Sequence, residues 1–214
     1  MRKIILGLDP GSLNTGFGVI EVSSGKMKYI DHGVISASPQ LDFVNRLKII
    51  GLEISEVVKK FQPDLTIVEK IFLGKNADSA FKLGHVRGIC LFEALKVESR
   101  VIEYAARSVK KGIVGSGAAT KEQVQLMLYA ALGLKNLQNS GASTKALKLD
   151  ASDALALAFY HARQVEFEER LELQKLRTLK PKTSKTLAAT QTSQANKTPE
   201  IPQAPQARLE KEIV

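Results

Sequence analysis

Apolar residues in the first third of the chain follow patterns that are typical of β-strands. Residues 3–9, KIILGLD, form a continuous apolar run that ends in one aspartate, as expected of a strand buried on both faces. TGFGVIEV and KMKYIDHGVISA follow after short turns, which predicts an antiparallel meander of three strands. Two later runs, LTIVE and RVIEYA, predict a fourth and a fifth strand.

Apolar residues recur with helical spacing in four longer segments. These segments are residues 42–61, 76–96, 120–132 and 150–164. Thr120 and Gln123 have the spacing of a capping box, so a helix is expected to begin there. Because the central strands are of the buried kind and helices separate the later strands, we predict an α/β fold. Its mixed five-stranded sheet would carry helices on both faces.

The composition changes after about residue 164, which predicts a folded domain over residues 1–164 and a C-terminal extension over residues 165–214. In the extension only VEFEERLELQKLRTL has helical spacing. The remainder is rich in Lys, Thr, Gln, Ala and Pro, a composition typical of a disordered tail. We therefore expect one domain followed by a mostly disordered extension.

The chain is basic, with a formal net charge of +9. Residues 165–214 hold 9 Lys and Arg against 7 Asp and Glu, a net +2, so +7 of the charge lies in residues 1–164. A basic folded domain indicates a polyanionic partner, nucleic acid rather than an anionic membrane surface. A generally basic protein without such a partner is the simpler alternative.

Cysteine content and apolar run lengths indicate the compartment. Cys90 is the single cysteine, so the chain has no intramolecular disulfide and no cysteine cluster for zinc. No apolar run approaches the length of a membrane span, and the run before Gly7 is too short for a signal peptide. We therefore expect a cytoplasmic protein without a membrane partner.

Two acidic residues end buried strands, and two more lie on one predicted helix. Asp9 follows the first apolar run and Glu69 follows LTIV, so adjacent parallel strands would place them side by side. Asp150 and Asp153 are three residues apart and share one face of a helix N-terminus. For each carboxylate taken alone, the role of a helix N-cap or of an exposed strand end is a sufficient explanation. Together, the four carboxylates predict a site for two Mg²⁺ or Mn²⁺ ions that promotes phosphoryl displacement.

The glycine-rich segment DPGSLNTG, residues 9–16, allows another interpretation. The phosphate loop of actin-like and sugar-kinase-like ATPases also places an aspartate before a glycine-rich hairpin with a threonine. Those enzymes need a second related domain, and about 164 folded residues are too few for one. In the carboxylate-site interpretation, Gly16 and Gly18 are expected to leave space for DNA or metal above the second strand.

Four blocks, GLDPGSLNTGFGVI, VEKIFLGKNADSAFKLGHVRG, YAARSVKKGIVGSGAATKEQV and DASDALALA, resemble the RuvC family of bacterial Holliday junction resolvases. The resemblance covers about residues 1–164. It implies a ribonuclease H-like fold and a homodimer that resolves four-way DNA junctions during recombination and repair. It implies paired symmetric nicks, with 5′-phosphate and 3′-hydroxyl ends, and the branch-migration proteins RuvA and RuvB as partners.

The resemblance also assigns roles to individual residues. The family's Mg²⁺-binding acidic residues fall on the same four carboxylates: Asp9, Glu69, Asp150 and Asp153. Two ions are implied, and Mn²⁺ is expected to substitute for Mg²⁺. The segment before Asp150, residues 133–149, is longer than is usual in the family, so the resemblance supports Asp153 more firmly than Asp150.

Three further residues match DNA-contacting positions of the family. Phe72 matches an aromatic residue that reaches the junction centre and interacts with unstacked bases; core packing is its alternative. Lys110 and Lys121 match basic residues near the scissile phosphate, where Lys121 would also act in catalysis. A solvated surface position is the alternative for both lysines.

Two further readings compete with the resolvase. One is a nuclease of the same fold that acts on other branched DNA or RNA. The other is a junction-binding protein with an inactive site, against which the intact acidic set argues. The segment 76–96, with Ala80, Leu83, Val86 and Leu91, is either a dimer interface or ordinary core.

Overall fold

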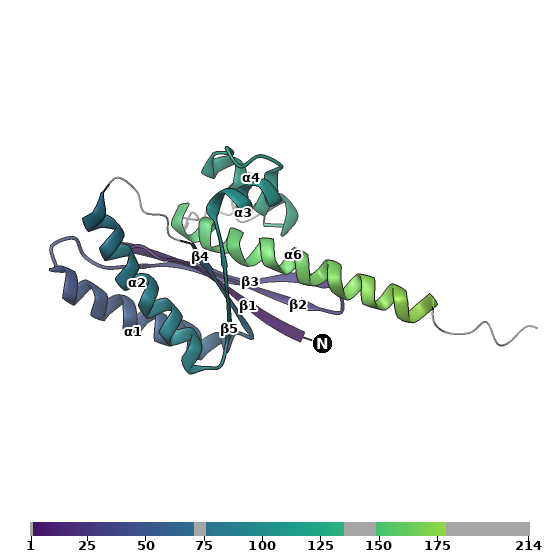
Figure 1. The fold of residues 1–214 in the computed structure, drawn as a ribbon, viewed down its shortest axis with the longest axis horizontal. Helices are drawn as coiled ribbons and strands as arrows, with labels where there is room; N and C mark the ends of the chain where they lie inside the picture. Colours follow the sequence, from purple (N-terminus) through teal and green to yellow (C-terminus); the bar gives the residue numbers. More distant parts are fainter. Residues whose placement is uncertain (1, 71–75, 135–148, 179–214) are drawn as a thin grey trace, which may run out of the picture. The chain divides into compact units, whose positions relative to one another are not determined.

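The computed structural model describes residues 2–70, 76–134 and 149–178 of the 214-residue chain. Figure 1 shows its elements, which are β1 (Arg2–Asp9), β2 (Asn14–Ser23), β3 (Lys26–Ser36), α1 (Phe43–Phe61), β4 (Leu65–Glu69), α2 (Ala77–Lys96), β5 (Arg100–Tyr104), α3 (Ala106–Val114), α4 (Lys121–Ala131) and α6 (Leu149–Thr178).

The strands form one mixed sheet in the order β3-β2-β1-β4-β5. β1 pairs antiparallel with β2 and β2 antiparallel with β3, whereas β1–β4 and β4–β5 are parallel pairs. The predicted mixed five-stranded sheet is therefore confirmed. The central position of β1 explains its continuous apolar run, because both of its faces are covered.

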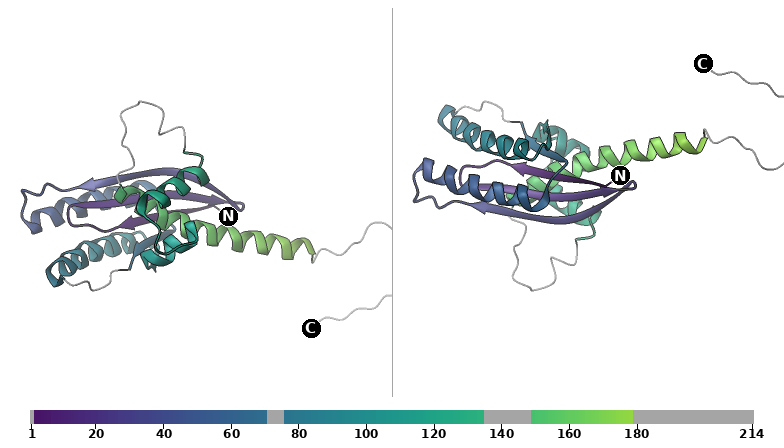
Figure 2. Two further views of the ribbon diagram at one scale, coloured as in Figure 1. Left: turned by 90° about the horizontal axis from the view of Figure 1, so that it is seen from above. Right: turned by 90° about the horizontal axis from the view of Figure 1, so that it is seen from below.

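Helices cover both faces of the sheet. Ile4, Leu6 and Leu8 of β1 pack in one buried cluster with residues of α1 and α2. Ile5 packs in a second cluster with residues of α3, α4 and α6, because successive side chains of a strand point to opposite faces. Figures 1 and 2 show α1 and α2 together on one side and α6 crossing the other, as the sequence predicted.

Two helix starts follow their local capping signals. The Asp42 side chain accepts a hydrogen bond from the Asn45 backbone N–H, and α1 begins directly after it. Thr120 and Gln123 form the predicted capping box at the start of α4. The sequence pattern missed α3, which is nine residues long, has no side-chain N-cap and buries only Val109 and Ile113.

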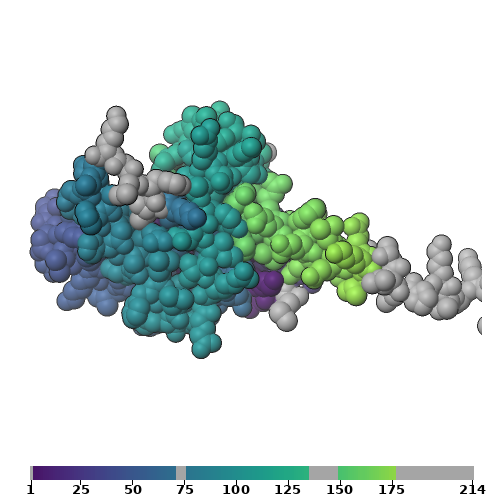
Figure 3. All heavy atoms as spheres, in the orientation of Figure 1, coloured from purple at the N-terminus to yellow at the C-terminus, as the bar shows by residue number. Residues whose placement is uncertain are grey.

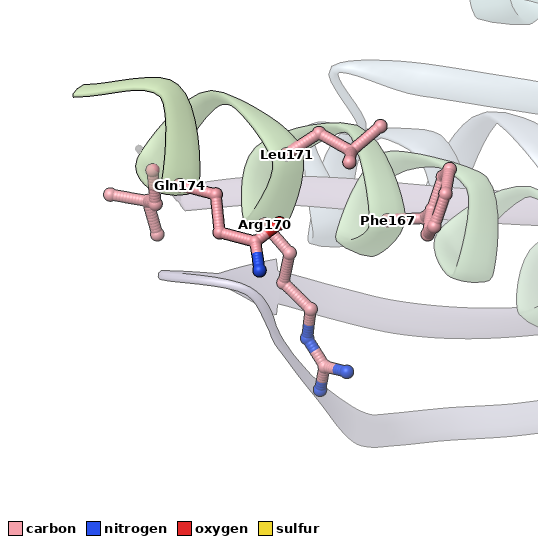
Figure 4. Close-up of a pocket in the computed structure, with 5 residues that line it drawn as sticks. Phe167, Arg170, Leu171 and Gln174 are labelled. Atoms are coloured by element: carbon pink, nitrogen blue, oxygen red, sulfur yellow. The ribbon is translucent and has the colours of Figure 1, made fainter. Parts of the chain in front are cut away.

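The last helix is longer than its apolar core predicts. α6 runs without a break to Thr178, so the predicted domain boundary after residue 164 falls inside a helix. Figure 1 shows its final turns extending past the ends of the strands, and in Figure 3 the same part of the chain projects from the rest of the described atoms. Figure 4 shows Arg170 extending from α6 toward the strands. Nearby, the Gly25 backbone N–H donates to the Glu169 carboxylate at 2.9 Å and ties the β2–β3 turn to the helix.

The remaining expectation for the extension, a disordered tail, concerns residues 179–214, which lie outside the described residues. In the part of the chain that the structure describes, no helix combines the length and the apolarity that a membrane crossing requires.

Candidate active site

Strand register places Asp9 and Glu69 next to each other. β1 and β4 are adjacent and parallel, and Leu8 pairs with Val68, so both strands reach their terminal carboxylates at the same sheet edge. Asp9 is two residues beyond Gly7, which contacts α6, and Glu69 is two residues beyond Ile67, which packs in the α6 cluster. Both side chains therefore emerge on the face that α6 covers.

Helix α6 adds Asp150 and Asp153 from its first turns. The helix lies unusually close to the sheet at this point, because glycines of β1 and β2 face it. A Cβ atom on Gly16 would lie 2.0 Å from the Asp150 carbonyl oxygen, and one on Gly18 would lie 2.4 Å from the Leu155 Cα. The expectation that these glycines leave space for DNA or metal is therefore wrong, since the backbone of α6 fills that space.

Burial and repulsion from neighbouring carboxylates dominate the electrostatics at Asp9 and Glu69. Burial, followed by the charges of Glu69 and Asp153, raises the pKa of Asp9 to about 8. Burial and the charge of Asp153 likewise raise the pKa of Glu69. The nearby ammonium groups of Lys121 and Lys110 oppose the rise at Glu69. The cluster thus lacks positive charge and would be stabilised by a cation.

Lys121 connects α4 to this cluster. It is the first residue of α4, and its ammonium group forms an ion pair with the Asp153 carboxylate of α6. Burial alone would lower the pKa of Lys121, but the hydrogen bond to Asp153 and the charges of Asp153, Asp9 and Asp150 outweigh it, so the pKa is raised. Lys121 is exposed, but its ammonium group is paired with a carboxylate of the acidic cluster.

Helix α3, which the sequence pattern did not predict, carries Lys110, the other lysine that the resemblance places near the scissile phosphate. Lys110 is partly buried on α3, and its charge acts on Glu69. The structure therefore brings Lys110 to the edge where β4 ends. Phe72, the predicted base-stacking residue, lies outside the described residues.

The turn after Asp9 is closed by its own hydrogen bonds. The Thr15 hydroxyl is buried and donates to the Gly11 carbonyl at 2.9 Å, while the Gly11 backbone N–H points back to the same hydroxyl at 3.3 Å. In an ATPase phosphate loop these groups would face the nucleotide. Their internal pairing argues against the kinase-like interpretation and identifies the segment as a tight turn that ends β1 at Asp9.

The donor chemistry fits a hard divalent cation. The four side chains offer only carboxylate oxygens, the ligands that Mg²⁺ and Mn²⁺ prefer. Burial beside other carboxylates raises the pKa of Asp9 to about 8, so a bound cation would stabilise its charged form. Among the described residues, no three acidic, histidine or cysteine side chains are already grouped as a metal site. The Lys121 ammonium group is ion-paired with one of the four carboxylates, that of Asp153.

Sequence analysis missed one group beside the site. Tyr104 ends β5 and pairs with Glu69 across β4–β5. Its hydroxyl donates to the Gln164 side-chain oxygen at 3.0 Å and lies 2.9 Å from His161 Nδ1, and its ring packs edge-on against Tyr160 of α6 at 4.9 Å. Tyr104 thus joins the sheet edge to α6, but a single aromatic residue at a strand end carries no signal for this role.

Comparisons with known proteins agree with this geometry. The family model described as crossover junction endodeoxyribonuclease RuvC matches residues 5–161. Crossover junction endodeoxyribonuclease RuvC of Bdellovibrio bacteriovorus is 49% identical over 179 residues, which cover 84% of this chain and 100% of the relative. The protein of the same name from Sodalis glossinidius is 44% identical over 158 residues, or 74% of this chain and 86% of the relative.

Solved structures agree as well. The Thermus thermophilus RuvC structure with a Holliday junction substrate matches at a TM-score of 0.65 and 31% identity, covering 78% of this chain and 97% of that chain. The yeast mitochondrial Holliday junction resolvase matches at a TM-score of 0.57 and 13% identity, covering 81% of this chain and 83% of that chain. This match supports the fold alone. By sequence and by fold, the chain belongs to the RuvC family of crossover junction endodeoxyribonucleases.

Proposed function

We propose that this enzyme resolves four-way DNA junctions by paired symmetric nicks during recombination and repair, with 5′-phosphate and 3′-hydroxyl ends. The observation that carries the proposal is the convergence of Asp9, Glu69, Asp150 and Asp153 at one sheet edge. A structure of similar fold and 31% identity is a RuvC with its Holliday junction substrate, which supports the same substrate here.

The family's nucleases depend on divalent metal, and Mg²⁺ is the ion we propose, with Mn²⁺ as a substitute. Asp9 would be the central metal ligand, because the charges of Glu69, Asp153 and Asp150 all act on it. The other three carboxylates would complete the two sets of ligands. When bound, the ions would supply Lewis-acid activation of the attacking water and stabilisation of the leaving 3′ oxygen.

Basic residues of α3 and α4 would hold the scissile phosphate. Without DNA, Lys121 neutralises Asp153. We propose that the ammonium group turns to the phosphoryl oxygens when DNA binds and stabilises the charge that develops there. Lys110 would contact the DNA backbone beside Glu69. Phe72 would stack on an unpaired base at the junction centre, a role that the family resemblance alone supports.

The outward face of α2 fits a second copy of the chain. Phe81, Phe92 and Leu95 are 71%, 63% and 61% exposed on this helix. A Cβ atom on Gly84 or Gly88 would meet nothing within 4 Å, so a partner helix could approach closely there. A two-fold dimer through this face would present two active sites to a junction of matching symmetry.

Two of the four α2 residues considered from sequence pack in the core. Val86 is fully buried and Leu91 packs against the α1–α2 core. For these two residues the core interpretation is therefore correct, and the proposed dimer face consists of other residues of α2. RuvA and RuvB as partners remain a proposal from the family resemblance. A cytoplasmic location remains a proposal from the cysteine content and the short apolar runs of the sequence.

A cleavage assay tests the proposed function. Labelled four-way, forked and duplex DNA would be incubated with the protein in Mg²⁺ or in EDTA. We expect paired symmetric nicks only in the four-way substrate with Mg²⁺. Asp9→Asn should bind junctions without cutting them, whereas Asp31→Asn, which removes a half-buried carboxylate paired with Lys60, should cut normally. Equal cutting of duplex DNA, or normal cutting by Asp9→Asn, would contradict the proposal.

A further inference from the structure

Three glycines form a strip without side chains on the sheet face under α6. Gly7 lies on β1, and Gly16 and Gly18 lie on β2. Gly7 pairs with Gly18 across the antiparallel ladder, and Asp9 pairs with Gly16. The strip therefore runs along β1 and β2 up to the residue directly opposite Asp9.

Each glycine faces the backbone of α6. A Cβ atom would lie 2.0 Å from the Ala154 carbonyl oxygen at Gly7, 2.0 Å from the Asp150 carbonyl oxygen at Gly16 and 2.4 Å from the Leu155 Cα at Gly18. Side-chain carbons essentially never approach closer than 3.0 Å. Because backbone atoms cannot escape by changing rotamer, an alanine at Gly16 would push the first turn of α6 away from the sheet by about 1 Å.

Gly16 is the glycine closest to the chemistry. Its neighbour across the ladder is Asp9, and the helix residue that it contacts is Asp150. The contact between Gly16 and Asp150 therefore sets the separation of the two carboxylates, one from β1 and one from α6. Oxygen ligands bind Mg²⁺ at about 2.0–2.1 Å with little tolerance, so a change of about 1 Å matters greatly.

We propose that Gly16 is a positioning residue that seats the first turn of α6 at the depth required for Asp9 and Asp150 to bind the same divalent ion. This inference rests on the proposed metal-dependent function and adds a determinant of metal affinity that does not itself touch metal or DNA. Gly18 has the same role one turn further along the helix, with a smaller overlap.

The chain offers a matched control. Gly33 lies on β3, where a Cβ atom would meet the Phe17 ring at 2.6 Å. Gly33→Ala therefore also strains the sheet, but its obstacle is a side chain and not the helix that carries Asp150. Both variants should lose thermal stability, whereas only Gly16→Ala should lose metal affinity.

The test measures Mg²⁺ binding to the DNA-free full-length protein by calorimetry, and junction cutting over a range of Mg²⁺ concentrations. For Gly16→Ala we expect Mg²⁺ affinity to fall about 10-fold to 100-fold. The Mg²⁺ concentration for half-maximal cutting should rise correspondingly, and junction binding in EDTA should stay within about threefold of wild type. Gly18→Ala should also lower the Mg²⁺ affinity and raise the Mg²⁺ concentration for half-maximal cutting, each by a smaller factor. If Gly16→Ala does not fold, Gly18→Ala provides the test.

Several outcomes would overturn the inference. The first is that Gly16→Ala folds and binds Mg²⁺ as tightly as wild type. The second is that Gly33→Ala loses as much Mg²⁺ affinity as Gly16→Ala. If only Gly18→Ala folds, wild-type Mg²⁺ affinity in that variant would overturn the inference. Failure of the wild-type protein to cut junctions would instead contradict the proposed function. The calorimetric comparison between the glycine variants would still decide the role of Gly16 in that case.

Discussion

Asp9 should make the metal-free protein less stable as the pH rises. Burial beside Glu69 and Asp153 raises its pKa from 3.8 to about 8 in the folded protein. The folded state thus holds a proton that the unfolded state releases near pH 4. The resulting contribution to stability is fully present below about pH 4, declines between about pH 4 and pH 8, and is absent above pH 8.

The size of the effect follows from the pKa difference. At about 1.4 kcal/mol for each pKa unit, a rise from 3.8 to about 8 corresponds to at most about 6 kcal/mol. Water entry and side-chain relaxation reduce the cost of a buried charge, so we expect Asp9→Asn to exceed wild type by about 2–4 kcal/mol in unfolding free energy at pH 8 in EDTA. The amide has the shape of the carboxylate and stays neutral at every pH, so this advantage should vanish near pH 4.

Urea unfolding in EDTA at pH 5, 6, 7 and 8 would measure the difference. Asp31→Asn serves as the control, because it makes the same chemical change at a carboxylate outside the acidic cluster, one that is paired with Lys60. Saturating Mg²⁺ at pH 8 should raise the stability of wild type more than that of Asp9→Asn. If the two pH profiles coincide in EDTA, or if Asp9→Asn is the less stable protein at pH 8, the buried acidic cluster is not the source of the effect.

Three other predictions concern neighbouring groups. Lys121→Gln should raise the Mg²⁺ affinity of the DNA-free protein about threefold, because no ammonium group then competes with the ion for Asp153. Its single-turnover rate of cutting at saturating Mg²⁺ should fall about 100-fold. Unchanged Mg²⁺ affinity in calorimetry would contradict this competition. Phe92→Glu should convert a dimer into monomers in analytical ultracentrifugation, and a dimer that persists would exclude this α2 face. Tyr104→Phe removes the hydroxyl that donates to Gln164 and should lower the unfolding free energy by about 1–2 kcal/mol in urea, with Mg²⁺ affinity unchanged.

Local patterns in the sequence were sufficient for the strands and for most of the helices. A continuous apolar run such as KIILGLD has one stable place, the centre of a sheet covered on both faces, and β1 occupies it. The capping box of Thr120 and Gln123 acts within four residues, so it could be identified without a structure. The short helix α3 was missed because nine residues with two buried positions hold too little periodicity.

The acidic residues were identifiable because their signals are also local. Asp9 and Glu69 each end an apolar strand, and the three-residue spacing of Asp150 and Asp153 places them on one helical face. The family resemblance added Lys110 and Lys121, but not the ion pair of Lys121 with Asp153, which joins residues 32 positions apart.

Only the tertiary structure decided what lies above the glycines. From sequence, Gly16 and Gly18 suggested open space for a ligand, whereas the backbone of α6 fills that space, about 130 residues further along the chain. The absence of a side chain is visible in a sequence, but the atoms that occupy the vacated volume are not. They depend on how the helix packs against the sheet, and this packing also places Asp150 opposite Asp9.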